Sequence, residues 1–168
     1  MISGCLLCAR PRSSSTASAR PTSTRPSNPA HSWWYATVLF WRPQVALFVN
    51  EPTLLPVLMP LAPGATLLER FPSTVAAVLA MHGAPQPIID DEMHRMREKR
   101  LAKTTNRSVT GVMTEFARLA EFYREGTSEL PELARRLARV PCGPLYKRHV
   151  SPDREFDAFL RSITPANG

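Results

Sequence analysis

Three short apolar segments stand close together in this chain and decide its fold class. Residues 33–40 (WWYATVLF), 45–49 (VALFV) and 53–59 (TLLPVLM) are rich in aromatic and β-branched side chains, which favour strands. The connections at 41–44 and 50–52 are short and contain proline, as turns often do. Parallel neighbours need a crossover of about a dozen residues, so these short connections favour antiparallel strands. The sequence therefore predicts an antiparallel meander of three or four strands.

The last of these segments contains Pro56, which limits its place in the sheet. Proline has no backbone N–H to donate to a neighbouring strand, so a strand that contains it lies at an edge or carries a bulge. We therefore expect the segment 53–59 to border the sheet. At least one face of the meander should be covered by other elements, because its strands are so apolar.

Beyond residue 60 the apolar residues recur with helical spacing. The clearest stripe comprises Val109, Val112, Met113, Phe116, Ala120 and Tyr123. Further helices are predicted within 65–82, from residue 87 onward, within 130–140 and after Ser151, which precedes a proline as helix caps often do. An antiparallel meander packed by about four to five helices is an α+β fold.

Two of the predicted helices carry specific expectations. We expect Pro72 to divide the first into a short opening piece and a main helix that runs to His82, with Gly83 as its C-terminal cap. In the helix after Pro87, the acidic run 90–92 should lie near the N-terminus, where negative charge is favourable.

The first thirty residues differ in composition from the rest of the chain. Residues 10–30 read RPRSSSTASARPTSTRPSNPA, so they cannot bury enough apolar surface to offset the entropy lost on ordering. We expect residues 1–31 to be a disordered extension, 32–164 to form a single α+β domain, and 165–168 to be a disordered tail. The C-x-x-C pattern at 5–8 lacks the context that a metal or redox site requires.

The charge of the chain does not by itself identify a partner. The chain has 21 basic and 14 acidic residues, for a net charge of +7, and four of the arginines fall in residues 1–31. In the remainder basic and acidic residues alternate, which is typical of a solvated surface with mixed charges. Arginine outnumbers lysine 18 to 3, which we interpret as a sign of bacterial origin.

The cysteine content and hydropathy bear on the compartment. Three cysteines are too few for a disulfide framework, which fits a reducing interior. No uninterrupted apolar run reaches the roughly 18 residues that a membrane-spanning helix needs. We therefore expect a cytoplasmic protein without membrane contact.

The best candidate site is a polar stretch directly before the strongest predicted helix. It comprises Lys103, Thr104, Thr105, Asn106, Arg107 and Ser108. Unpaired N–H groups at helix N-termini favour anions, and the two cations could add charge-assisted bonds, so the stretch predicts an anion-binding site. The alternative is that Thr105, Asn106 or Ser108 only caps the helix. Gly111 within this helix would be explained by a close approach of the helix to the sheet.

No other constellation carries a strong chemical signal. Asp90 and His94 share a helix face but lack a nameable third metal ligand, and Cys142 with His149 is a weak nucleophile–base signal. No Gly-rich phosphate loop is present. The aromatic residues at 33–41 could stack on bases, but core packing is their commoner use. We therefore predict no catalytic residue, no metal and no cofactor.

Several motifs in a fixed order resemble those of a known family. Residues 34–36 (WYA), 47–51 (LFVNE) and 103–113 (KTTNRSVTGVM) follow the pattern W-Y-A … L-F-V-N-E … K-T-x-N-R-S-V-x-G-x-M. This pattern resembles an uncharacterised bacterial family of small stand-alone proteins, over residues 33–160. The family is a domain of unknown function, so the resemblance implies the limits of the domain and no activity.

Three functions remain open from the sequence. A non-catalytic regulatory or binding module ranks first, with a protein partner on the sheet edge or an apolar patch. Nucleic-acid binding ranks second, through the stretch 103–108 and the basic residues Arg135, Arg136, Arg139, Lys147 and Arg148. An enzyme that acts on an anionic metabolite, bound by Lys103, Asn106 and Arg107, ranks third.

Overall fold

The computed structural model describes residues 33–96, 106–126 and 129–163. The predicted extension 1–31, the tail 165–168 and the part of the polar stretch that precedes Asn106 lie outside the described residues.

The predicted meander is confirmed. Strands β1 (Trp34–Leu39), β2 (Val45–Asn50) and β3 (Pro56–Pro60) form one antiparallel sheet in the order β1-β2-β3. β3 lies at an edge of this sheet, as Pro56 requires.

The third strand begins later than the segment 53–59 predicts. Thr53 and Leu54 belong instead to the turn after β2, where the Asn50 side chain accepts bonds from the Thr53 backbone at 3.3 Å and hydroxyl at 2.8 Å. Leu54 has a φ of 59°, in the left-handed region, and its N–H donates to the carbonyl of Asn50 at 2.8 Å. These local bonds compete with strand pairing and delay the start of β3.

The described residues form five α-helices, which confirms the α+β fold. These are α1 (Leu67–Met81), α2 (Gln86–Arg95), α3 (Arg107–Arg124), α4 (Leu130–Ala138) and α5 (Pro152–Ile163). Short 3-10 turns cover Gly64–Thr66 and Gly143–Leu145. None of the helices in this part of the chain combines the length and apolar character that a membrane crossing requires.

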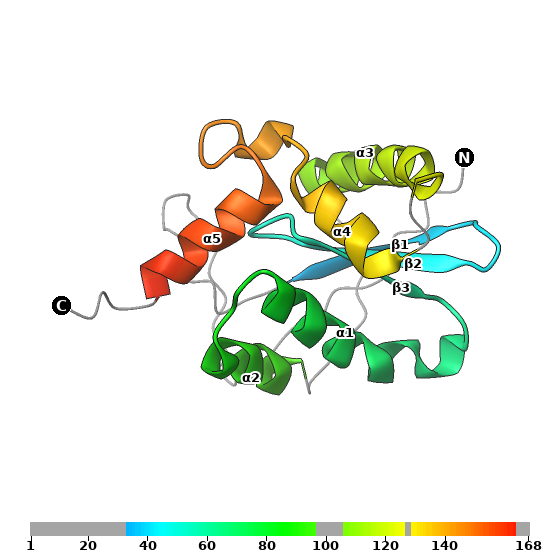
Figure 1. Cartoon of the computed structure of the whole chain (residues 1–168), viewed down its shortest axis with the longest axis horizontal. Helices are drawn as coiled ribbons and strands as arrows, with labels where there is room; N and C mark the ends of the chain where they lie inside the picture. Colours follow the sequence, from blue (N-terminus) through cyan, green and yellow to red (C-terminus); the bar gives the residue numbers. More distant parts are fainter. Residues whose placement is uncertain (1–32, 97–105, 127–128, 164–168) are drawn as a thin grey trace, which may run out of the picture.

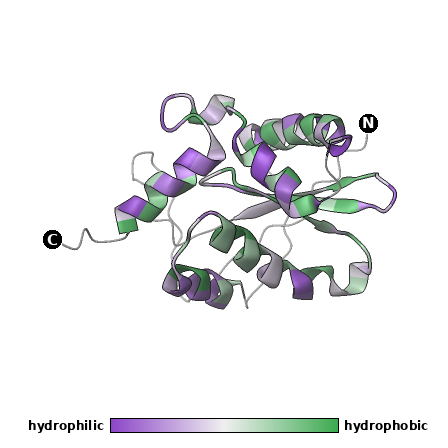
Figure 2. Ribbon diagram, viewed as in Figure 1, coloured by the Kyte–Doolittle hydropathy of each residue, from purple (hydrophilic) through white to green (hydrophobic). Residues whose placement is uncertain are grey.

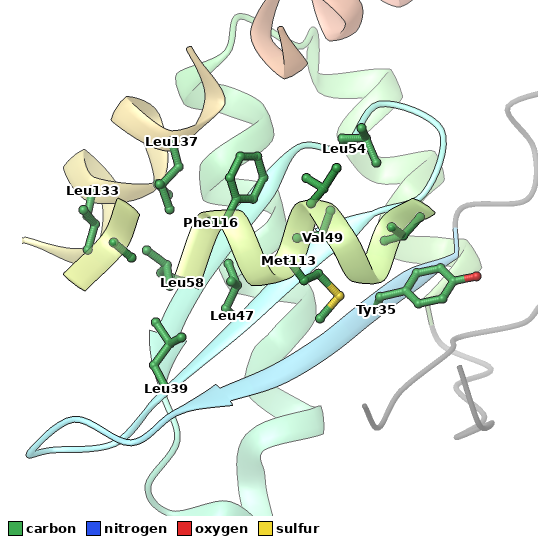
Figure 3. Packing of buried hydrophobic residues seen from close by; sticks show 14 of the residues in the cluster. Tyr35, Leu39, Leu47, Val49, Leu54, Leu58, Met113, Phe116, Leu133 and Leu137 are labelled. Atoms are coloured by element: carbon green, nitrogen blue, oxygen red, sulfur yellow. The ribbon is translucent and has the colours of Figure 1, made fainter. Parts of the chain in front are cut away.

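Helices cover both faces of the sheet, so the domain has three layers (Figure 1). All six residues of β2 are buried, and the five apolar ones alternate between two cores. Leu47 and Val49 pack with Phe116 of α3 and Leu137 of α4 (Figure 3). Hydrophobic residues run along most of β2, whereas the helices mix hydrophobic and hydrophilic residues (Figure 2). The complete burial of a large apolar side chain such as Phe116 contributes about 1.5–3 kcal/mol to folding.

The second core lies between the other face of the sheet and helices α1, α2 and α5. Phe48 of β2 stacks on Phe71 of α1 with ring centroids 4.1 Å apart, and Trp34 meets Phe71 edge-on at 5.5 Å. Phe156 of α5 joins the same cluster. The beginning of β1 therefore anchors helices that are more than thirty positions away in the sequence.

Two helix expectations are wrong in detail. Pro72 lies inside a continuous α1, because burial of Phe71 and Val75 on either side outweighs the one backbone bond that proline cannot donate. The acidic run 90–92 lies in the middle of α2, which begins at Gln86 with no acid in its first turn. Gly83 does adopt a positive φ of 77° after α1, as expected of a C-terminal cap.

The expected reason for Gly111 is also wrong. A Cβ at this position would meet no atom within 4 Å, so no close approach of α3 to the sheet requires glycine there.

Candidate functional site

A cavity bordered by described residues lies at the end of the sheet. There the β2–β3 turn faces α2 and α5 (Figure 1). Its volume is about 480 Å³, within the range of about 300–1,000 Å³ that is typical of small-molecule sites. The apolar part of its wall comprises Leu55, Leu79, Ile88, Phe156, Phe159 and Ile163. Charged and polar side chains complete the wall from three separate segments.

Helix α2 contributes a buried carboxylate to the cavity. Glu92 is 9% exposed, and its Oε1 accepts a hydrogen bond of 3.1 Å from the indole Nε1 of Trp34. On the same helix, Asp91 forms an ion pair with Arg95, and both side chains also line the cavity. A buried carboxylate costs free energy unless it is bonded, so the indole of the first strand helps to hold Glu92 in the wall.

Helix α5 contributes a second buried carboxylate from the opposite side. The Glu155 side chain is 5% exposed and pairs with Arg148 and His149, whose Nδ1 lies 2.7 Å from Oε2 of Glu155. Both partners come from the loop before α5. Because Nδ1 faces the carboxylate, the hydrogen bond favours the His149 tautomer that carries its proton on Nδ1.

The loop that presents Arg148 and His149 is fixed by backbone bonds. The N–H of Cys142 donates to the carbonyl of Val150 at 2.8 Å, and the N–H of Val150 donates to that of Leu145 at 2.9 Å. Val150 has a φ of 72°, which turns the chain sharply into α5. At the start of α5 the Ser151 side chain donates to Asp153.

The β2–β3 turn forms the third wall and links the cavity to α3. Asn50 and Thr53 line the cavity, while the neighbouring Glu51 accepts a hydrogen bond of 2.7 Å from Nδ2 of Asn106. The other end of the same amide caps α3: Oδ1 of Asn106 accepts from the N–H groups of Ser108 at 3.0 Å and Val109 at 3.3 Å.

The predicted anion-binding residues therefore divide into two groups. Lys103, Thr104 and Thr105 lie outside the described residues. Asn106 is the helix cap, and Arg107 and Ser108 border a smaller hollow of about 280 Å³ together with Cys142 and Gly143. Anion binding by this stretch stays a prediction, with the capping alternative realised at Asn106.

The weaker candidates do not come together. Asp90 accepts a bond from Gln86 at 2.8 Å, and the described residues contain no group of three metal-ligating side chains. Cys142 is buried with its thiol near the carbonyl of Val140, and His149 instead pairs with Glu155. Burial, reinforced by the charge of Glu115, raises the pKa of the Cys142 thiol to about 11.

The aromatic and basic residues that suggested nucleic-acid contact also have structural partners. Trp34 and Trp41 are buried, at 2% and 9% exposure, as the core-packing interpretation predicts. The Nε atoms of Arg135 and Arg136 donate to Glu132 at 2.8 and 3.3 Å, which lowers the pKa of that half-buried carboxyl.

The cavity was not predicted from the sequence, although one feature of α2 indicates it. Glu92 lies three positions after Ile89 and four before Met96, so it falls on the inward stripe of α2. A carboxylate at such a position is uncommon, since charged residues are rarely buried without a partner. Glu155 lies four positions before Phe159, which packs against the second core, and so gives the same signal in α5.

The comparisons with known proteins address family membership. Neither the search of curated proteins nor the search of solved structures found a match to this chain. One family model matches residues 12–155, a range that begins within the segment predicted to be a disordered extension. The protein thus belongs to the family described as a domain of unknown function, DUF6933.

Proposed function

We propose that the protein is a non-catalytic binding module that holds a small organic molecule in the cavity between α2 and α5. The observation that carries the proposal is the cavity itself, in which two buried carboxylates, Glu92 and Glu155, border a largely apolar space. A small number of fixed polar groups in an apolar wall is the usual composition of a ligand site, because the apolar wall provides affinity and the polar groups provide orientation.

The polar groups of the cavity are held before any ligand arrives. Trp34 bonds Glu92, His149 bonds Glu155, and the Asn50 side chain is bonded within its turn. Because these side chains are already held in place, binding a ligand costs less conformational entropy. This favours the cavity over the exposed basic residues as the functional site.

A fragment screen by saturation-transfer NMR tests the proposal when it is paired with a blocked variant. Ser162 is exposed at the cavity and its hydroxyl donates to the carbonyl three residues earlier at 2.7 Å. Ser73 makes the same local bond to Arg70 at 2.7 Å, is exposed on α1 and does not line the cavity. Ser162→Trp should fill the mouth, and Ser73→Trp is the matched control.

We expect fragments that bind the wild-type protein and Ser73→Trp, with binding lost in Ser162→Trp. Fragments that bind all three proteins equally would place their site elsewhere. A screen without any hit, across cationic, neutral and anionic fragments, would contradict the proposed function.

A further inference from the structure

The side chain of Asn50 carries one hydrogen-bonding group without a partner in the described part of the chain. Its Oδ1 accepts from the N–H of Thr53 at 3.3 Å and from the hydroxyl of Thr53 at 2.8 Å. A backbone N–H can only donate, so this bond fixes which end of the amide is the oxygen. The nitrogen, Nδ2, is the other end, and it forms no hydrogen bond with any residue of 33–96, 106–126 or 129–163.

The remaining polar groups of Asn50 are engaged, and the residue is buried. Its N–H donates to the carbonyl of Leu55 at 3.0 Å, and its carbonyl accepts from the N–H of Leu54 at 2.8 Å. Asn50 is 6% exposed and lines the cavity at the end of β2. Buried donors in native proteins are almost always hydrogen-bonded, because an orphaned donor costs free energy. The N–H groups of Nδ2 therefore need an acceptor from outside the described residues, and the cavity is where one can reach them.

The charged residues of the wall favour a neutral acceptor over an anion. Arg95 pairs with Asp91, and Arg148 pairs with Glu155, so both guanidinium groups that line the cavity already face a carboxylate. A carboxylate ligand would have to compete with these side chains for an ionic partner. A neutral carbonyl oxygen needs only an N–H donor, which Nδ2 supplies.

The rest of the wall suits an apolar body on the same ligand. Phe156 and Phe159 lie with ring centroids 6.0 Å apart, and aliphatic side chains such as Leu79 line the cavity with them. An apolar wall with a few fixed polar groups binds by burial of the body and orients the ligand through the polar groups.

We infer that the ligand is a neutral carbonyl compound, a ketone or an amide on an apolar body, whose carbonyl oxygen accepts a hydrogen bond from Nδ2 of Asn50. This inference rests on the proposed function, since it names the chemical class for the same cavity. The Asn50 side chain is the determinant of selectivity, because its oxygen is held in the turn and its nitrogen can only donate.

Three small probes that share a phenylalkyl body test the inference on the full chain. They are 4-phenylbutan-2-one, 3-phenylpropionate and 3-phenylpropylamine, which carry a neutral acceptor, an anionic acceptor and a cationic donor. We expect the ketone to bind about tenfold or more tightly than the other two probes, the selectivity that satisfying one buried donor provides. The ketone should also shift the side-chain NH₂ cross-peaks of Asn50 in ¹H–¹⁵N spectra of the wild-type protein.

Two variants that each replace an amide by a carboxylate separate a local effect from the overall charge. Asn50→Asp keeps an oxygen for the two bonds from Thr53 and removes the donor, and the same bonds favour the ionised carboxylate. Gln44→Glu makes the same chemical change between β1 and β2, at an exposed position outside the cavity. The ketone should lose about tenfold or more in affinity in Asn50→Asp and keep its affinity in Gln44→Glu.

The other outcomes overturn the inference in distinguishable ways. Tightest binding of the carboxylate or of the amine to the wild-type protein would reject the neutral carbonyl class, and this comparison holds even if Asn50→Asp does not fold. Ketone binding that leaves the Asn50 NH₂ cross-peaks unshifted, or that weakens equally in both variants, would reject Asn50 as the donor. Failure of all three probes beside fragment hits that Ser162→Trp blocks rejects the class alone, whereas failure of every fragment rejects the proposed function as well.

Discussion

The indole nitrogen of Trp34 donates a 3.1 Å hydrogen bond to Oε1 of Glu92, and this bond joins the first strand to α2. Trp34 is 2% exposed and packs edge-on against Phe71, so one face of the indole belongs to the core. Glu92 in turn lines the cavity. Because the same bond serves the core and the candidate site, changes to it should alter both stability and the cavity wall.

Trp34→Phe should destabilise the protein by about 2–4 kcal/mol, since it removes buried volume and the indole donor to a buried carboxylate. Trp41→Phe is the comparison. The Trp41 indole donates to Glu121, whose side chain is 60% exposed, so water can replace the lost donor and the cost should be smaller. Urea unfolding of the two variants measures the difference, and equal losses would contradict this account of Glu92.

Asn106→Ala should lower the stability of the ligand-free protein by about 0.5–2 kcal/mol, because the side chain caps α3. Arg107→Ala should change the stability little, since Arg107 is exposed.

A double-mutant cycle of Asn106→Ala with Glu51→Ala isolates the 2.7 Å bond between Asn106 and Glu51. If Arg107→Ala also abolishes a phosphate-induced rise in Tm, the anion site is supported. An unchanged Tm in Asn106→Ala would instead refute the capping role.

Gly111→Ala and Gly83→Ala should shift stability in opposite directions. At Gly111, inside α3, a Cβ meets nothing within 4 Å, so alanine should stabilise the protein by up to about 1 kcal/mol. At Gly83 the φ of 77° strains any other residue, so alanine should destabilise it by about 1 kcal/mol. Denaturant midpoints of the two variants provide the test. A loss of stability in Gly111→Ala would contradict the open space around this position.

The elements that the sequence predicts correctly are those with a local cause. The stripe from Val109 to Tyr123 encodes α3 by spacing alone, and Pro56 places β3 at the edge through its missing donor. Pro72 misleads because its cost is local, whereas the burial of Phe71 and Val75 that keeps α1 continuous comes from the tertiary packing.

The cavity depends on tertiary packing even more strongly. Its walls come from the turn after β2, from α2 and from α5, so Asn50, Glu92 and Glu155 meet only in the folded chain. No spacing rule links these positions. By contrast, the helix entry at Asn106 could be predicted because a cap acts on the next three residues.

His82 at the end of α1 should make stability depend on pH. Burial lowers its pKa below 6.5, against the opposing effect of Asp153 and Asp157, while Arg135 and Arg139 lower it further. A lowered folded-state pKa means that the unfolded chain takes up the proton first as the pH falls. The wild-type protein should therefore lose stability below about pH 6.5 relative to His82→Gln.

Urea midpoints of the wild-type protein and His82→Gln at pH 7.5 and 5.0 measure this effect, because the shared acid dependence of the carboxylates cancels in the difference. The advantage of the wild-type protein should shrink at the lower pH. A constant or growing advantage would show that protonated His82 is not disfavoured in the folded state.

Cys142 should resist alkylation in the folded protein. With its pKa raised from 9.0 to about 11 by burial and by Glu115, about one thiol in a thousand is ionised at pH 8, against about a tenth for an ordinary thiol. In a Cys5→Ser/Cys8→Ser variant, where Cys142 is the remaining cysteine, iodoacetamide labelling followed by mass spectrometry should be at least about a hundredfold slower than in unfolding urea. The stability contribution of the protonated thiol is complete below pH 9.0, the ordinary value, and should be lost as the pH rises toward about 11. Labelling at pH 8 as fast as in urea would mean that the thiol is accessible and ionised, and would reopen a chemical role for the loop that carries it.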